Sequence, residues 1–368
     1  MHVGIATGFA NHAPIKDQQF VGEELAQLEL AEELGFESAW ITEHHFSEYS
    51  LSPNPLFYLG YLAGRTKRMR LGTQVLVVPW HDPVRLAEEI ILLDQVSNGR
   101  AIIGFGRGLA RIEFEGLRVD QGTARERFDE TVGMVMAALE TGFIEGGEIF
   151  KQPRRELRPR PVRSLRGRAF CAAGSPTSMA AAARLGLGLL YLGQPMVGGK
   201  TPDSPLGRMV RDDAADAWLQ AWQQHQPKRA PVAPFVSNLV FIDESGDKAR
   251  EMARKYTSNQ FAHAVDHYEL TSPHHGTIKG YESYKSLRMS REDADVAIKN
   301  AYASAIAGSP REVLEQLDQV RQVRQPQGMY PHLYTGGMPH NECVAAMQLF
   351  AKTCLKEMQS WPGAPLTI

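Results

Sequence analysis

The sequence predicts an α/β protein of the (β/α)8 TIM barrel class, with an insertion late in the barrel. Short apolar runs alternate along the chain with helical patterns of about a dozen residues, which is typical of parallel α/β proteins. Residues capable of chemistry follow several of these runs directly, as active-site residues follow the strands of a (β/α)8 barrel. Eight runs have this character: residues 3–7, 38–41, 69–78, 101–106, 169–173, 187–192, 234–242 and 328–334.

The first half of the chain carries clear helix signals. A stripe of apolar residues between positions 20 and 34 ends at Gly35, a common C-terminal stop. Residues 53–64 predict a second helix. Asp82-Pro83 matches an N-cap followed by a first-turn proline, and the helix that it opens ends at Gly99. A loop then leads from Arg107 to a helix over residues 124–140.

Three segments after residue 150 do not fit the repeat. Residues 151–168 hold seven arginines and three prolines. We interpret them as a solvated connection between barrel units rather than a nucleic-acid surface, because aromatic residues are nearly absent. Residues 263–300 predict an insertion. Either the loop 194–205 or the segment 263–291 is expected to form a mobile cover of the kind that barrels use as lids.

The remaining elements of the second half follow the barrel pattern. Helices are expected over 176–185, around Trp218 and Trp222, and over 248–262. Ser309 and Glu312 form a capping-box pattern that opens a helix reaching about residue 323. Residues 343–358 predict the closing helix.

Composition limits the classes of function. The 368 residues, 43% hydrophobic and 22% charged, have ordinary globular composition, and no boundary divides residues 1–368 into two domains. A net charge of −2 provides no field for nucleic acid or a membrane. Three scattered cysteines favour a reducing compartment and argue against zinc. No signal peptide or membrane span is recognisable, so we expect a cytoplasmic protein.

The run Gly104-Phe105-Gly106-Arg107-Gly108 follows a predicted strand. It fails the dinucleotide-binding pattern because Leu109 stands where the third glycine is required. Glycines at a strand exit let the backbone approach a ligand, and Arg107 could bind phosphate or carboxylate. By position alone, an exposed arginine near a helix start is an equally good interpretation.

Gly174-Ser175-Pro176-Thr177-Ser178 joins another strand to a helix. Free N–H groups at a helix N-terminus attract anions, and Ser175 and Ser178 can add hydroxyl donors. Alone, the pattern favours an ordinary serine N-cap. On the same barrel face as Arg107, it favours a phosphate site.

Glu43-His44-His45 follows the strand at 38–41. Adjacent histidines on an extended segment point apart, and the spacing of a known metal site is missing, so no metal is predicted here. An acid beside a histidine at a strand exit suits proton handling by Glu43 and His44. For His45, a buried structural histidine is the better interpretation.

Together these motifs closely resemble the bacterial luciferase-like flavin monooxygenase family. The resemblance rests on ITEHHFSEYSLSPNP at 41–55, LGTQVLVVPWHDPVRLAEEIILLDQVSNGR at 71–100 and GFGRGLARIEFEGL at 104–117. It continues in RERFDE at 125–130, AAGSPTSMAAAARLGLGLL at 172–190, AGSPREVLEQL at 307–317 and GGMPHNECVAAMQLF at 336–350. Similarity therefore runs along nearly the whole chain.

The resemblance implies a (β/α)8 barrel that binds FMN. It implies that Arg107, Ser175 and Ser178 bind the FMN phosphate. It also implies that the flavin ring lies against the backbone at Gln74–Val75, where a non-proline cis peptide is expected. His44 would assist proton transfer on a loop shared with Glu43, so these two are the catalytic candidates. The implied cofactor-binding set is Thr73, Gln74, Val75, Gly106, Arg107, Arg125, Gly174, Ser175 and Ser178.

The partners are also implied by the resemblance. No nicotinamide-binding module is recognisable, so FMNH2 would come from a separate NAD(P)H:flavin reductase, and O2 would react with it through a C4a-peroxyflavin. The substrate would be a small organic molecule and the protein a homodimer. Gln74 and Trp80 differ from luciferase itself and argue against a long-chain aldehyde. The alternatives are an F420-dependent oxidoreductase of the same superfamily and a non-catalytic flavin-binding subunit.

Overall fold

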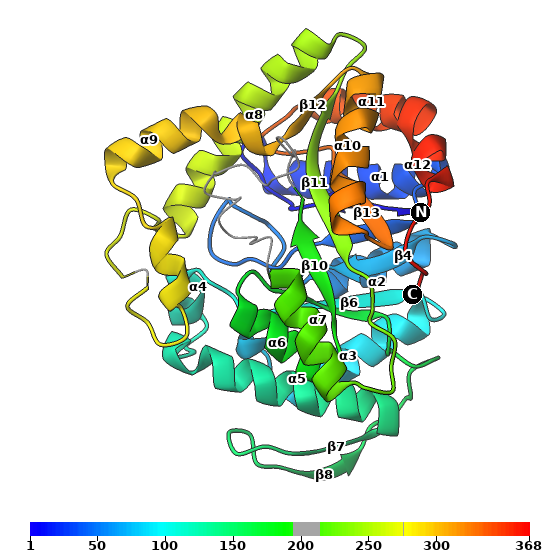
Figure 1. Cartoon of the computed structure of the whole chain (residues 1–368), viewed down its shortest axis with the longest axis vertical. Helices are drawn as coiled ribbons and strands as arrows, with labels where there is room; N and C mark the ends of the chain where they lie inside the picture. The colour runs from blue at the N-terminus through cyan, green and yellow to red at the C-terminus, as the bar shows by residue number, and fades with distance from the viewer. Residues whose placement is uncertain (194–213, 275) are drawn as a thin grey trace.

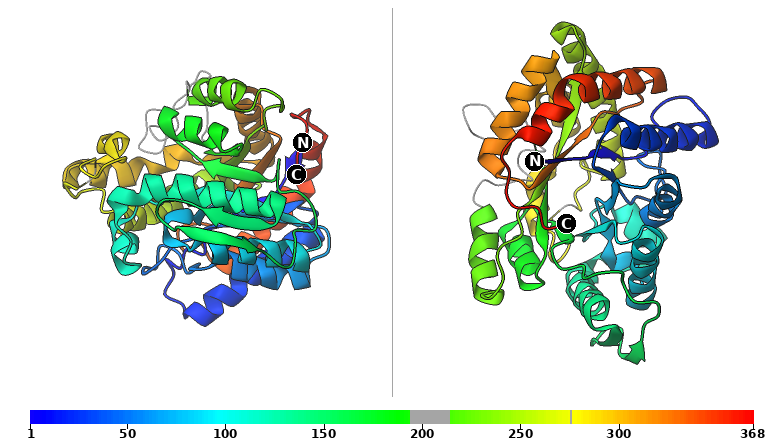
Figure 2. Two further views of the ribbon diagram at one scale, coloured as in Figure 1. Left: turned by 90° about the horizontal axis from the view of Figure 1, so that it is seen from below. Right: turned by 90° about the vertical axis from the view of Figure 1, so that its right-hand side faces the viewer.

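The computed structural model describes residues 1–193, 214–274 and 276–368, and its central feature is a closed barrel of parallel strands (Figures 1 and 2). The N-terminal strand consists of β1 (His2–Val3) and β2 (Ile5–Thr7). It closes the ring because β1 pairs with β13 (Gly328–His332), while β2 pairs with β3 (Ser38–Ile41). Between β3 and β13 the ring runs through β4 (Arg70–Thr73), β6 (Ala101–Gly106), β9 (Ala169–Ala172), β10 (Gly188–Leu192) and β11 (Phe235–Ile242). The predicted (β/α)8 TIM barrel is confirmed.

Aromatic side chains pack the barrel interior. The indole of Trp40 is fully buried, stacks on Tyr330 with ring centroids 4.5 Å apart and lies 5.1 Å from Phe235. Gly72 on the neighbouring strand leaves room for this indole, since a β-carbon there would collide with it. The interior is therefore a packed core and not a pore.

Helices connect successive strands around the barrel, and the predicted caps are present. Gly35 ends the first helix in the left-handed conformation, with φ of 97°. The Asp82 side chain accepts hydrogen bonds from the N–H groups of Val84 and Arg85, and Ser309 forms the capping box with Glu312. The helices are α1 (Asp17–Leu34), α2 (Pro55–Arg65), α3 (Pro83–Val96), α4 (Arg111–Gly116), α5 (Ala124–Thr141), α6 (Pro176–Arg184), α7 (Ala214–His225), α8 (Gly246–His267), α9 (Arg291–Asn300), α10 (Pro310–Arg324), α11 (His340–Phe350) and α12 (Lys356–Ser360).

Several predicted elements differ from those observed. The run 69–78 is broken after β4, where the cis peptide Gln74–Val75 precedes β5 (Leu76–Val77). The loop expected after Arg107 contains α4. A short strand, β12 (Ile306–Gly308), pairs with β11 on the outside of the ring path. The closing helix is interrupted by a π-helical turn, Ala351–Leu355, between α11 and α12.

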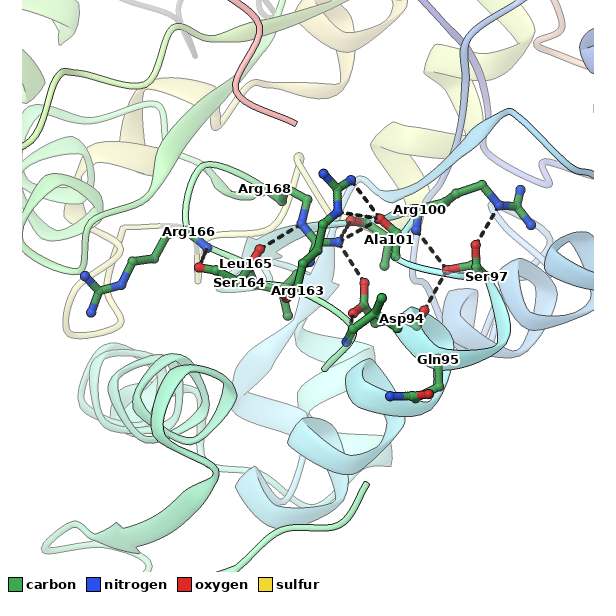
Figure 3. Close-up of polar contacts among 12 residues, drawn as sticks. Asp94, Gln95, Ser97, Arg100, Ala101, Arg163, Ser164, Leu165, Arg166 and Arg168 are labelled. Carbon is green, nitrogen blue, oxygen red and sulfur yellow. Dashed lines mark hydrogen bonds and ion pairs between the residues drawn. The ribbon is translucent and has the colours of Figure 1, made fainter. Parts of the chain in front are cut away.

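The arginine-rich connection is only partly solvated, which corrects the prediction. Its first part contains β8 (Gln152–Glu156), which forms an antiparallel hairpin with the preceding strand β7 (Phe143–Gly146), and this hairpin projects beyond α5 (Figure 1). Arg168, by contrast, is 1% exposed and forms a 2.7 Å ion pair with the buried Asp94 of α3 (Figure 3). The charge pattern alone does not separate the buried arginine of this stretch from the exposed ones, because the partner of Arg168 lies 74 residues earlier in the chain.

The segment predicted as an insertion begins inside a helix, since α8 extends to His267 and not to residue 262. Between α8 and α9 the described residues form turns and a 3-10 helix, Glu282–Leu287. A separate apolar cluster that includes Phe261, Leu270 and Leu287 packs this region together. The loop predicted at 194–205 lies outside the described residues. No helix in the described parts of the chain is long and apolar enough to cross a membrane.

Candidate active site

A cavity of about 430 Å³ opens at the carboxyl ends of the barrel strands. Strand-end residues form its floor, while α8 and the segment between α8 and α9 supply much of its apolar wall. The lining includes eight of the sequence-predicted site residues, namely Glu43, His44, Gln74, Val75, Gly106, Arg107, Gly174 and Ser178. The lining does not include the other three predicted site residues, which are Thr73, Arg125 and Ser175.

One side of the cavity carries positive charge and hydroxyl groups. Arg107 donates to the carbonyl of Gly280 over 2.5 Å, and its guanidinium lies 4.0 Å above the ring of Tyr281. Arg125 donates to the Ser178 hydroxyl at 2.8 Å, and that hydroxyl lies 3.0 Å from the hydroxyl of Ser175. A doubly charged phosphate could accept hydrogen bonds from several of these donors.

The start of α6 faces the same side of the cavity. Ser175 is its N-cap and accepts a hydrogen bond from the Ser178 N–H at 3.2 Å, so the ordinary capping interpretation holds locally. Both roles are compatible, because N–H groups of the first turn remain unpaired within a helix and attract anions.

The backbone next to β4 forms one wall of the cavity. Gln74 and Val75 line it and are joined by the expected cis peptide bond. Gly106 faces Val75 so closely that a β-carbon would overlap the valine side chain. Thr73 is fully buried and fastens β4 to β6, because its hydroxyl donates to the Gly104 carbonyl at 3.0 Å and accepts from the Gly104 N–H at 2.9 Å.

Glu43 anchors the end of this wall. Its carboxylate, 2% exposed, accepts hydrogen bonds from the Val77 N–H at 2.7 Å, from His81 at 2.8 Å and from His45 at 3.3 Å. Burial acts to raise its pKa, but the charge of His81 and the three hydrogen bonds outweigh burial and hold the pKa at about 2. A carboxylate that accepts three hydrogen bonds and stays ionised is suited to positioning the backbone rather than to donating a proton.

His44 lies in a polar cluster on the other side of the wall. Its Nδ1 is 3.0 Å from Oε1 of Glu113 on α4, and its Nε2 is 3.4 Å from the hydroxyl of Tyr268. Burial acts to raise the pKa of Glu113, but the imidazoles of His267 and His44 outweigh it and hold the pKa at about 2. An ionised Glu113 can only accept, so a neutral His44 carries its proton on Nδ1 and presents Nε2 to the cavity.

Four residues of the site were missed from the sequence. Glu113 lies in α4, within a stretch expected to be a loop, while His267 and Tyr268 lie in the segment assigned to an insertion. His332, at the end of β13, lies 3.4 Å from the side-chain amide of Gln74, and burial lowers its pKa to about 4. The strand-end rule that found His44 passed over His332, because the run predicted at 328–334 extends beyond the observed end of β13 at His332.

The sequence model of the luciferase-like monooxygenases matches residues 1–324. The chain belongs to this family. Membership confirms the resemblance and the expected enzyme class, a flavin-dependent monooxygenase, which is an oxidoreductase.

Curated relatives of this family member include the alkanal monooxygenase alpha chain of Photorhabdus luminescens. That chain is 26% identical over 296 residues, which covers 78% of each protein. The oxygenase component of the flavin-dependent trigonelline monooxygenase from Acinetobacter baylyi is 30% identical over 176 residues, or 46% of this chain and 49% of that protein.

Solved structures agree with the family fold. The monooxygenase RslO1 from Streptomyces bottropensis superposes with a TM-score of 0.72 at 26% identity, covering 97% of this chain and 100% of that one. Two more distant structures share the fold: the oxygenating constituent of 3,6-diketocamphane monooxygenase from Pseudomonas putida, in complex with FMN, and an F420-dependent tetrahydromethanopterin reductase from Methanopyrus kandleri. The diketocamphane structure has a TM-score of 0.70 at 16% identity and covers 96% of this chain and 97% of its own. The reductase structure has a TM-score of 0.64 at 20% identity and covers 97% of this chain and 99% of its own.

Proposed function

We propose that the protein is the oxygenase component of a two-component system, which takes FMNH2 from a separate NAD(P)H:flavin reductase and uses O2 to oxygenate a small organic substrate. The observation that carries the proposal is the pairing, in one cavity, of a cationic, hydroxyl-rich side with the backbone wall at Gln74–Val75. FMN has a phosphate for the first and a planar ring for the second. A relative named as an oxygenase component supports the two-component arrangement.

The residues of this chain fit FMN in distinct roles. Arg107, Arg125, Ser175 and Ser178 would hold the phosphate. Gln74, Val75 and Gly106 would lie against the ring, with Thr73 and Glu43 as positioning residues behind them. Reduced FMN supplies the electrons that activate oxygen, which is chemistry the side chains cannot perform.

His44 would act as the proton-handling residue. Its Nδ1 is held by the Glu113 carboxylate, so its Nε2 can accept or return a proton at the cavity side. The apolar wall built by Phe261, Leu270 and Leu287 would exclude water and favour an apolar substrate.

The test is an anaerobic titration with FMNH2, followed by mixing with oxygen. The complex should form, and bound flavin should be reoxidised more slowly than free FMNH2, because a closed site controls what reaches it. His44→Asn should leave FMNH2 affinity unchanged and lower product formation about 10²–10⁴-fold, once a substrate is identified.

The second candidate is an F420-dependent oxidoreductase, which a structure of the same fold favours. Binding of reduced F420 with no FMNH2 binding and no oxygen uptake would replace the first proposal with the second. Flavin binding without any turnover by the isolated chain would instead identify a non-catalytic subunit.

A further inference from the structure

Three side chains that are far apart in the sequence converge beside the cavity. They are His44 after β3, Glu113 in α4 and His267 at the end of α8. One ligand atom of each lies within 4.8 Å of the other two. From this geometry we propose that His44, Glu113 and His267 form a binding site for a divalent transition-metal ion of the zinc or copper type.

The two spacings that involve the Glu113 carboxylate suit coordination, whereas the nitrogens of His44 and His267, which lie within 4.8 Å of each other, would have to approach one another when an ion binds. A tetrahedral ion with bonds of about 2.0–2.1 Å keeps its ligand atoms about 3.3–3.4 Å apart. Oε1 of Glu113 lies 3.0 Å from Nδ1 of His44 and 3.4 Å from Nε2 of His267. The two imidazole rings are nearly perpendicular, at 88°, with centroids 5.2 Å apart, so their nitrogens can approach one ion from different directions.

The outer nitrogens are held as metal-bound histidines usually are. Nδ1 of His267 lies 2.8 Å from the Ser47 hydroxyl, and Nε2 of His44 lies 3.4 Å from the Tyr268 hydroxyl. Such contacts fix the ring orientation and leave the opposite nitrogen for the ion. The inner nitrogen, Nε2 of His267, belongs to a side chain 1% exposed and faces the Glu113 carboxylate at 3.4 Å.

The ligand types select the class of ion. Two imidazoles and one carboxylate form the protein ligand set of an open zinc site, with a further position free for water. Calcium and magnesium prefer sites made of oxygen atoms, and no thiolate is present here to favour a softer ion. The sequence alone could not reveal this set, because the neighbouring His45 points elsewhere and the other two ligands are distant.

A second pocket borders the site. His267 borders a second, more open pocket of about 510 Å³, and Tyr49 lines both this pocket and the main cavity. Four acidic residues against one arginine line the second pocket, which favours entry of a cation. These are Glu48, Glu115, Asp266, Glu269 and Arg111.

Occupancy would have a consequence for the proposed activity. An ion bound to Nδ1 of His44 displaces the proton that Glu113 holds there and fixes the imidazole, so turnover should fall and should recover when a chelator removes the ion. This consequence rests on the proposed function, whereas binding itself does not.

The test uses the full chain without added histidines, dialysed against EDTA and titrated with Co²⁺, whose visible absorption reports nitrogen and oxygen coordination. We expect one Co²⁺ per chain, displaceable by Zn²⁺. His267→Asn should abolish the band, and Ser47→Ala should weaken affinity about 10–100-fold by freeing the ring. His225→Asn, which alters an exposed histidine on α7, should change nothing.

Absence of a Co²⁺ band in the wild type, or a band retained at full strength in His267→Asn, would overturn the proposal. Ser47→Ala keeps the test decisive if His267→Asn fails to fold, since it retains all three ligands. Inhibition by Zn²⁺ is recorded separately from binding, so failure of the proposed oxygenase activity leaves the binding result intact.

Discussion

Arg107 is the residue on which the phosphate assignment depends most directly. It lines the cavity and reaches Gly280 and Tyr281. Arg107→Ala should weaken FMNH2 binding by about 1.5–3 kcal/mol, because a charge-assisted contact to the phosphate is lost. Equilibrium titration measures the change. Arg85→Ala, on the exposed side of α3, is the matched control, and equal affinity of the two variants would refute the assignment.

Glu43 gives a prediction that separates positioning from proton transfer. Burial acts to lower the pKa of His81, but the charge of Glu43 and a hydrogen bond to it raise that pKa above 6.5. In Glu43→Gln only the burial effect remains strong, so the His81 pKa should fall. NMR titration of the imidazole resonances measures it. His332, which does not contact Glu43, should keep its pKa near 4, and an unchanged His81 would contradict the prediction.

The Glu43–His81 pair also predicts how the stability of the fold depends on pH. The lowered pKa of Glu43 stabilises the fold above 4.5, and this contribution is lost as pH falls towards 2. The raised pKa of His81 stabilises the fold below 6.5, and its contribution is lost as pH rises through the folded value. The difference in unfolding free energy between wild type and Glu43→Gln should therefore be largest between pH 4.5 and 6.5, as urea unfolding can measure. A difference independent of pH would argue against this pair.

At the scale of elements, one buried ion pair joins α3 to the start of β9. Arg168 contacts Asp94 at 2.7 Å and also donates to the carbonyls of Gly99, Ala101 and Ser164 (Figure 3). Arg168→Met should lower the unfolding free energy by about 3–5 kcal/mol, because Asp94 is left buried without its partner.

Urea denaturation compares this variant with Arg158→Ala. Arg158 belongs to the same arginine-rich stretch, but its side chain is 70% exposed, and its pair with Glu156 should be worth less than about 1 kcal/mol. A similar loss in both variants would show that the stretch acts through its overall charge and not through one buried contact.

The elements also show what the sequence can predict. Ser38–Ile41 and Ala101–Gly106 were located to the residue, because a buried parallel strand is a short apolar run bounded by turn signals. The β7–β8 hairpin was missed, since β8 is polar and largely exposed and β7 has only two apolar residues, Phe143 and Ile144. Glu113 was missed for another reason: its role depends on His44 and His267, which only the folded chain brings to it.

At the scale of the whole molecule, the segment between α8 and α9 is connected to the candidate phosphate site. Gly280 accepts from Arg107, the Tyr281 hydroxyl donates to the Gly108 carbonyl at 3.0 Å, and Arg111 pairs with Glu269. We propose that this segment is the cover of the cavity. A cofactor that binds only when the cover is in place stabilises the closed form, and this stabilisation grows with the logarithm of the cofactor concentration above its dissociation constant.

Limited trypsin digestion tests this coupling, because Lys279, Lys285 and Arg288 lie in the segment. FMN at 100 times its dissociation constant adds about 2.7 kcal/mol to the closed form, so cleavage there should slow about 100-fold if it requires opening. Cleavage at Arg154 or Arg155 should keep its rate, because these residues lie in the β7–β8 hairpin, which projects beyond α5 (Figure 1) and supplies none of the described residues that line the cavity. Equal protection at both places would indicate general stabilisation of the barrel, and no protection at either would remove the segment from the cofactor site. Protection confined to the segment, and lost in Arg107→Ala, would tie the cover to the phosphate contact.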